Sequence, residues 1–188
     1  MAFMSEEDAR KIGFKRLGTG VRISDKTCFY GVERIEIGDH CRIDDFCLIS
    51  AGEKGIKMGR NVHVACYVSL IGSELIQLDD FVGVSAKSCV YSSTDDYSGE
   101  YLTNPTVPEE YKNVINGPVV MEKHALVGAG CVVLPGVRLG LGCCVGAMSL
   151  VTKDCEPYGM YVGIPAKLVK QRSDRTAELE ARYLAEKG

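Results

Sequence analysis

The sequence has no tryptophan and only three histidines among its 188 residues, and it lacks any long apolar or basic run. A membrane-spanning helix needs about 18 or more apolar residues in succession, so no membrane span is expected. The formal net charge of −3, without a basic cluster, argues against a nucleic-acid partner. The first ten residues are acidic and unlike a secretory signal peptide. We therefore expect a cytoplasmic protein.

An aliphatic residue recurs every six positions over most of the chain. A six-residue period is neither that of a helix nor that of an alternating strand. It indicates short strands joined by turns, in coils whose aliphatic side chains point inward and stack on their counterparts one coil away. The pattern predicts a mainly β chain folded as a parallel β-helix. The fifteen aliphatic positions are Ile37, Ile43 and Ile49; Met58, Val64 and Leu70; Leu78, Val84 and Val90; Met121, Val127 and Val133; and Leu139, Val145 and Val151.

The chain forms one predicted domain whose β-helix spans 21–165 and is interrupted once. Because an open last coil would expose strand edges, we expect a helical cap over 1–20, with Ser5 as the helix N-cap, and a C-terminal helix over 166–188. Residues 92–118 have no apolar period and are rich in Asp, Ser, Asn, Pro and Tyr. Such a long polar excursion predicts a functional loop.

The nine cysteines fit a reducing compartment and free thiols, since no secretory signal is present. No C-x-x-C pair exists and the three histidines are scattered, so no metal site is expected. Six cysteines fall on the small corner position of the repeat, which predicts buried apolar packing rather than a nucleophile. They are Cys28, Cys41, Cys47, Cys131, Cys143 and Cys155.

The C-terminal coils resemble those of the hexapeptide-repeat acyltransferases. The similarity lies in VGAGCVVLPGV from Val127, VGAMSLVTK from Val145 and VGIPAK from Val162, and it extends over nearly the whole chain. It implies a left-handed coil, an exception to the right-handed crossover of parallel strands. It also implies a homotrimer with active sites between subunits and coenzyme A along the C-terminal coils. The residues expected to bind the cofactor are His124, Gly128, Ala129, Gly146, Ala147, Lys153, Lys167 and Arg172.

The loop sequence SSTDDYSGEYLTNPTVP, from Ser92, is similar to the branch that N-acylates nucleotide-linked amino sugars such as dTDP-4-amino-4,6-dideoxyglucose. This resemblance implies acetyl-CoA or another short acyl-CoA as co-substrate and a place in O-antigen or other surface polysaccharide biosynthesis. It assigns Ser85 and Asp95 to orienting the acceptor amine, as the catalytic pair. The residues expected to contact the nucleotide sugar are His63, Asp96, Tyr97, Glu100, Tyr101 and Asn104.

Two alternatives remain open. Sugar O-acetyltransferases of the same fold carry a histidine base at the loop entry, where this sequence has Asp95 and Asp96. A hydroxyl acceptor needs such a base near neutral pH, whereas a neutral amine is already nucleophilic and can lose its proton to the leaving thiolate. The aspartates therefore favour an amine acceptor. A non-catalytic β-helix scaffold is the other alternative, which the glycine-rich tail and the polar loop disfavour.

Overall fold

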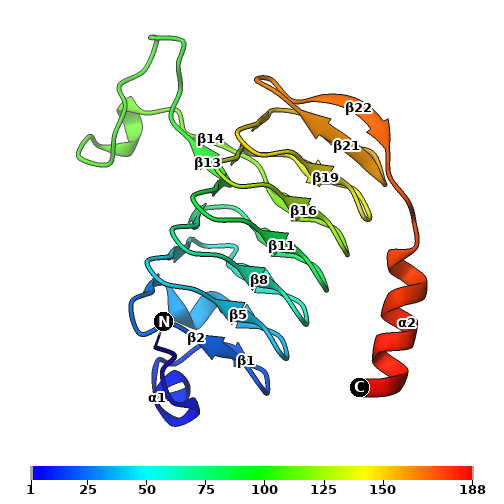
Figure 1. Cartoon of the computed structure of the whole chain (residues 1–188). Helices are drawn as coiled ribbons and strands as arrows, with labels where there is room; N and C mark the ends of the chain where they lie inside the picture. Colours follow the sequence, from blue (N-terminus) through cyan, green and yellow to red (C-terminus); the bar gives the residue numbers. More distant parts are fainter. Residues whose placement is uncertain (1, 188) are drawn as a thin grey trace.

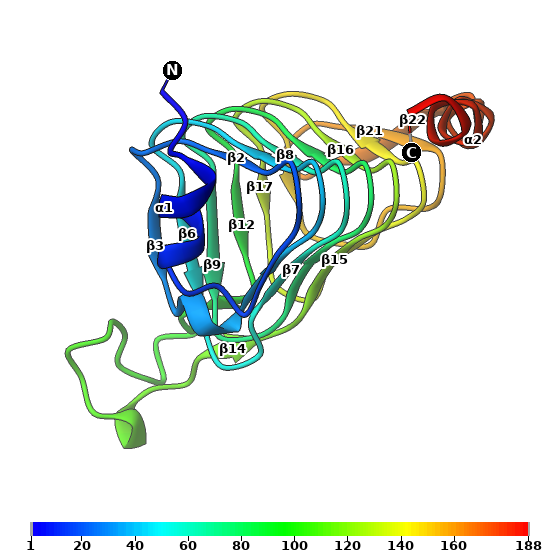
Figure 2. The same ribbon diagram turned by 90° about the horizontal axis from the view of Figure 1, so that it is seen from below.

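The computed structural model describes residues 2–187, and its strands wind into a parallel β-helix with three faces (Figure 1, Figure 2). Face 1 consists of β1 (Arg16–Leu17), β4 (Ile35–Ile37), β7 (Ile56–Met58), β10 (Ile76–Leu78), β15 (Val119–Met121) and β18 (Arg138–Leu139). Face 2 consists of β2 (Arg22–Ile23), β5 (Arg42–Ile43), β8 (His63–Val64), β11 (Gly83–Val84), β16 (Leu126–Val127), β19 (Cys144–Val145), β21 (Gly159–Val162) and β22 (Lys167–Gln171). Face 3 consists of β3 (Cys28–Tyr30), β6 (Leu48–Ala51), β9 (Ser69–Gly72), β12 (Cys89–Tyr91), β17 (Val132–Val133) and β20 (Leu150–Val151).

Each coil passes through faces 1, 2 and 3 in turn, so the cross-section is a triangle with corners 1/2, 2/3 and 3/1 (Figure 2). A short 3-10 turn, η1 (Val32–Arg34), interrupts corner 3/1 of the first coil. The sequence prediction of a mainly β parallel helix is confirmed. Because consecutive strands belong to different sheets, all pairing along the helix is between coils, and the core is the column enclosed by the three faces.

The strand register confirms the six-residue repeat. All fifteen predicted aliphatic side chains point inward and are at most 4% exposed. Burying one such side chain stabilises the fold by about 1.5–3 kcal/mol. The columns are Ile37, Met58, Leu78, Met121 and Leu139 on face 1; Ile43, Val64, Val84, Val127 and Val145 on face 2; and Ile49, Leu70, Val90, Val133 and Val151 on face 3.

Five of the six corner cysteines are buried as predicted, and Cys28 is the exception. Cys28 pairs with Leu48, one position after Cys47, so its side chain faces outward and is exposed. Ile23 and Phe29 pair with Ile43 and Ile49, so the lead-in coil keeps the register of the repeat and its corner residue is Thr27. Burial raises the pKa of both Cys41 and Cys47 to about 11, which keeps these thiols protonated and unreactive.

The N-terminal cap follows the prediction. Helix α1 (Glu6–Lys11) lies across the open first coil (Figure 2), with Ala9 buried against the core. The Ser5 hydroxyl accepts a hydrogen bond from the Asp8 amide, as an N-cap does. The segment expected to be helical ends earlier than predicted, because β1 already belongs to face 1.

The C-terminal prediction was partly wrong. Helix α2 spans only Thr176–Lys187, and the residues before it form β22, antiparallel to β21. Strand β22 covers the edge of face 2 that the last coil would otherwise leave unpaired. Helix α2 then turns back and runs beside the coils at corner 1/2 instead of closing the end (Figure 1).

Contacts at corner 1/2 hold α2 against the β-helix. The Glu180 carboxylate lies 2.8 Å from Nε2 of His124 and 3.0 Å from Nζ of Lys123. The His124 ring stacks on Phe81, whose ring meets Tyr183 edge-on at 5.9 Å. These contacts fasten the helix to a corner on the opposite side of the triangle from face 3.

The predicted loop leaves corner 3/1 and projects from the β-helix (Figure 1). Its two ends pair as antiparallel strands, β13 (Ser93–Thr94) and β14 (Ile115–Asn116), and η2 (Glu109–Tyr111) lies near its end. The antiparallel stem fixes the direction of the loop relative to face 3. In the portion of the chain that the structure describes, neither helix has the length and apolarity needed to cross a bilayer.

Candidate active site

A cavity of about 680 Å³ lies between the loop and the outer side of face 3. Asp95, Tyr97 and Asn104 line it from the loop. Apolar side chains of face 3, among them Tyr91 and Leu134, form its floor. Three residues predicted from the sequence are thus brought to one cavity, which offers an aromatic ring, a carboxylate and an amide to a polar ligand.

Asp96 has a different position from its neighbour Asp95. Its carboxylate accepts hydrogen bonds from the Ser98 amide at 2.7 Å and from Nδ2 of Asn113 at 2.9 Å. The hydrogen bonds from Ser98 and Asn113 lower the pKa of the Asp96 carboxyl. Asp96 therefore joins the two arms of the loop, and its role as a substrate contact stays a prediction.

Glu100 and Tyr101 lie at the exposed tip of the loop and do not line the cavity. Their assignment to substrate binding also stays a prediction. Because the tip projects away from its own coils (Figure 1), any ligand or protein surface that these side chains contact lies beyond the body of this chain.

Ser85 and Asp95 lie at different corners of the same coil. Ser85 directly follows β11 at corner 2/3, whereas Asp95 directly follows β13 at corner 3/1. Strand β12 crosses the width of face 3 between them, and Ser85 does not line the cavity. Within one chain the predicted pair therefore does not form a single site.

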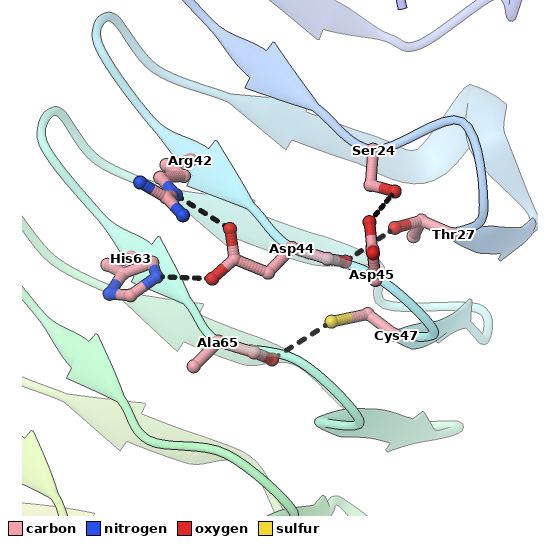
Figure 3. Close-up of polar contacts among 8 residues, drawn as sticks. All are labelled: Ser24, Thr27, Arg42, Asp44, Asp45, Cys47, His63 and Ala65. Atoms are coloured by element: carbon pink, nitrogen blue, oxygen red, sulfur yellow. Dashed lines mark hydrogen bonds and ion pairs between the residues drawn. The ribbon is translucent and has the colours of Figure 1, made fainter. Parts of the chain in front are cut away.

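His63 is the predicted substrate residue with the best-defined surroundings (Figure 3). It lies on face 2, and its Nε2 is 2.9 Å from the carboxylate of Asp44, which also accepts a hydrogen bond from Arg42 at 2.6 Å. Burial opposes ionisation of Asp44, but the hydrogen bonds from Arg42 and His63 outweigh it and lower the pKa of this carboxyl. No sequence pattern predicts this pair, because it depends on the coil-to-coil register.

Four of the predicted cofactor-binding residues, Gly128, Ala129, Gly146 and Ala147, form a strip of small side chains at corner 2/3. A Cβ atom on Gly128 would lie 2.6 Å from the Ala147 amide nitrogen, and one on Gly146 would lie 2.6 Å from Cγ1 of Val162. Backbone packing between coils therefore requires Gly128, whereas at Gly146 the exposed Val162 side chain would have to shift. Ala129 and Ala147 are exposed and leave the backbone accessible beside them.

The predicted cations lie close to the last coils. Lys153 and Lys167 are exposed, and Arg172 donates a hydrogen bond to the Gly142 carbonyl at 3.1 Å. His124 is held under α2 by Glu180, with its side chain only 11% exposed. The cofactor roles of all four residues stay predictions. Within residues 2–187 no three histidine, cysteine or acidic side chains are grouped as a metal site would require.

Comparison with known proteins identifies the family of this chain. Residues 118–153 match the family described as hexapeptide repeat of succinyl-transferase. The dTDP-4-amino-4,6-dideoxy-D-glucose acyltransferase of Escherichia coli is 45% identical over 96% of this chain and 94% of its own length. The chain belongs to this acyltransferase family.

The structure is also similar to solved structures of an N-acyltransferase with bound ligands. AntD, an N-acyltransferase from Bacillus cereus in complex with dTDP and 3-hydroxybutyryl-CoA, is 40% identical, has a TM-score of 0.94, and the match covers 98% of this chain and 97% of that one. A serine-to-cysteine variant of AntD, in complex with dTDP-4-amino-4,6-dideoxyglucose and coenzyme A, is 39% identical with the same TM-score of 0.94 and the same coverage of 98% and 97%. The acyltransferase assignment made from the resemblance of the C-terminal coils is thereby confirmed.

Proposed function

We propose that this acyltransferase moves a short acyl group from acyl-CoA to the amino group of dTDP-4-amino-4,6-dideoxyglucose. The observation that carries the proposal is the polar loop over face 3, whose cavity presents Asp95, Tyr97 and Asn104 on a fold shared with AntD along nearly its whole length. A tyrosine ring offers a stacking surface to a pyrimidine base. The carboxylate and amide offer hydrogen-bond partners to a sugar.

The chemistry requires an amine, a thioester and groups that orient them. The amine nitrogen attacks the thioester carbonyl carbon, the C–S bond breaks, and the thiolate of coenzyme A leaves and takes up the proton that the nitrogen loses. Ser85 and Asp95 accept hydrogen bonds from the amine and direct its lone pair at the carbonyl. No histidine is needed at the loop entry, because the amine is nucleophilic once neutral.

The active site is formed between subunits of a homotrimer. Ser85 and Asp95 lie at opposite edges of face 3, so one subunit supplies the serine and its neighbour supplies the aspartate. The outer side of face 3 supports such packing because it is apolar and only half-buried in the single chain. Its outward residues include Leu48, Ile71, Tyr91, Val132, Leu134 and Leu150. Cyclic closure of three copies would cover this face.

The enzyme acts in the cytoplasm, on a nucleotide sugar destined for O-antigen or another surface polysaccharide. Nine free thiols in the described chain suit a reducing compartment. We take acetyl-CoA as the donor, with 3-hydroxybutyryl-CoA as the competing donor to be compared with it.

Release of free thiol from acyl-CoA tests the proposal. Purified enzyme is expected to release coenzyme A with dTDP-4-amino-4,6-dideoxyglucose and not with the matching 4-hydroxy sugar nucleotide. Release with the hydroxy sugar alone would establish an O-acyltransferase instead. Absence of release with any sugar nucleotide and either donor would overturn the proposed activity.

A further inference from the structure

A carboxylate–imidazole pair lies one coil from Ser85 on the outer side of face 2. The Asp44 side chain is 7% exposed, whereas the His63 side chain is 49% exposed. Figure 3 shows that the two side chains meet across adjacent coils, and that the second ring nitrogen of His63 points away from Asp44. The pair therefore has one end buried among its partners and the other open to a ligand.

Asp44 determines which ring nitrogen of neutral His63 carries the proton. The carboxylate is ionised and can only accept, so Nε2 of His63 donates to it. Nδ1 of the neutral ring is then left with a lone pair. No hydrogen bond to Nδ1 forms within the described residues 2–187. Because the His63 side chain is half exposed, this nitrogen can accept a hydrogen bond from a donor outside the chain.

Gly83 leaves the strand position next to His63 without a side chain. It pairs directly with His63 in the strand register and is the residue before Val84 and Ser85. Its backbone does not have a positive φ, and a Cβ atom there would meet only Cδ1 of Leu126, at 3.1 Å. Neither the backbone nor coil packing requires glycine here, unlike at Gly128. A glycine inside a strand weakens it and often marks a position where a ligand approaches closely.

We propose that Gly83 and the Asp44–His63 pair form a subsite for the hexose ring of the acceptor, in which Nδ1 of His63 accepts a hydrogen bond from a ring hydroxyl. Asp44 is a positioning residue that fixes the ring, and Gly83 leaves room for the sugar between His63 and Ser85. The subsite rests on the proposed function, since it places the hexose next to the serine that orients its amine. It lies on face 2, so the neighbouring subunit's loop and this face enclose the acceptor from two sides.

Substrate analogues lacking one ring hydroxyl test the subsite. Acceptors without the 2-hydroxyl or the 3-hydroxyl are compared with the parent sugar nucleotide, using wild-type enzyme and His63→Phe. For wild type, one of the two analogues is expected to lose roughly 5- to 10-fold in kcat/KM, the range of one neutral hydrogen bond. With His63→Phe, kcat/KM for the parent sugar nucleotide is expected to fall by this same factor. The analogue that is sensitive in wild type should then be acylated by His63→Phe as efficiently as the parent. His63→Gln, whose amide oxygen can accept, should restore part of the discrimination.

Gly83→Ala provides an independent measurement. The added methyl group should raise KM for the acceptor about 10-fold or more and leave KM for acyl-CoA unchanged, with the thermal transition as in wild type. His40→Asn is the matched control, because His40 is an exposed turn histidine with φ +58°, a conformation that Asn tolerates; it should change neither KM.

The two hypotheses fail in different ways. If wild type acylates the amino sugar while His63→Phe keeps the wild-type discrimination between parent and both analogues, the subsite is wrong and the proposed function stands. An unchanged acceptor KM in Gly83→Ala would likewise overturn the subsite. If wild-type enzyme releases no thiol with any amino sugar nucleotide, the proposed function itself fails.

Discussion

Single buried side chains connect one coil to the next in this protein. Leu78 illustrates this, because it is fully buried and pairs with Met58 below and Met121 above. The Leu78–Met121 contact also bridges the point where the loop interrupts the repeat. Closing that insertion brings together residues 43 positions apart in the sequence, so this column holds the two halves of the β-helix in register.

Leu78→Ala should therefore destabilise the protein by about 2–5 kcal/mol, from lost burial and from the cavity left between the two methionines. Thermal unfolding of Leu78→Ala is compared with that of Leu126→Ala. The second variant removes a 44%-exposed side chain on the outer side of face 2 and should shift the unfolding temperature much less. Equal shifts for the two variants would contradict the assigned packing.

At the reacting centre, the double variant Ser85→Ala, Asp95→Asn should lower kcat/KM by about 100-fold, because the serine hydroxyl is lost and the charged carboxylate acceptor becomes a neutral amide. The fold should be unaffected, since neither side chain packs in the core. Asp25→Asn, an exposed carboxylate on the first coil, is the control. A double variant with unchanged kcat/KM would remove these residues from the mechanism.

At the scale of elements, helix α2 depends on a partly buried ionic contact. Burial opposes ionisation of Glu180, but Lys123 and His124 outweigh it and lower the pKa of the Glu180 carboxyl below its model-compound value of 4.5. Because the pKa of this carboxyl falls on folding, its ionised form stabilises the docked helix at pH values above the pKa of the unfolded state. That stabilisation is lost as the pH falls through its folded pKa.

Glu180→Gln should therefore accelerate amide hydrogen exchange in α2 about 10-fold at pH 7. The difference from wild type should begin to shrink as the pH falls below 4.5 and should vanish below the lowered pKa of the docked Glu180 carboxyl. Glu178→Gln, an exposed position on the same helix, should leave exchange unchanged. A difference that persists at low pH would show that the contact acts through packing and not through charge.

At the scale of the whole molecule, the three corners of the triangle have separate roles. Corner 1/2 carries α2, corner 2/3 carries Ser85, and corner 3/1 carries the loop (Figure 2). In the proposed trimer, corner 2/3 of one subunit meets corner 3/1 of its neighbour across face 3. This arrangement explains why the single chain holds the cavity and the serine apart.

Subunit mixing tests this arrangement directly. Ser85→Ala trimers and Asp95→Ala trimers are each expected to be weakly active. After unfolding and refolding together in equal amounts, about one quarter of the sites should contain both native residues and regain activity. Each variant refolded alone is the control. No recovery from the mixture, with mixed trimers verified by mass, would place both residues of a site in one subunit.

The two ends of the β-helix show which features sequence patterns predict and which they miss. Ser5 was found as an N-cap because its hydrogen bond is local, three residues along the chain. The strand β22 was missed because its residues are paired only by the edge of β21, a partner that exists once the last coil has formed. Cys28 was misplaced for a different reason, since it stands five residues after the inward Ile23 and not four, and Thr27 is the corner residue of that coil.

The sequence by itself determined the β-helix, its fifteen inward positions and the loop, because a six-residue period repeats the same local requirement in every coil. Only the tertiary structure decided which residues meet across coils and corners. It paired His63 with Asp44, set Gly83 beside them and separated Ser85 from Asp95 by the width of face 3. Such contacts depend on coil lengths of 16 to 43 residues, and no local pattern encodes them.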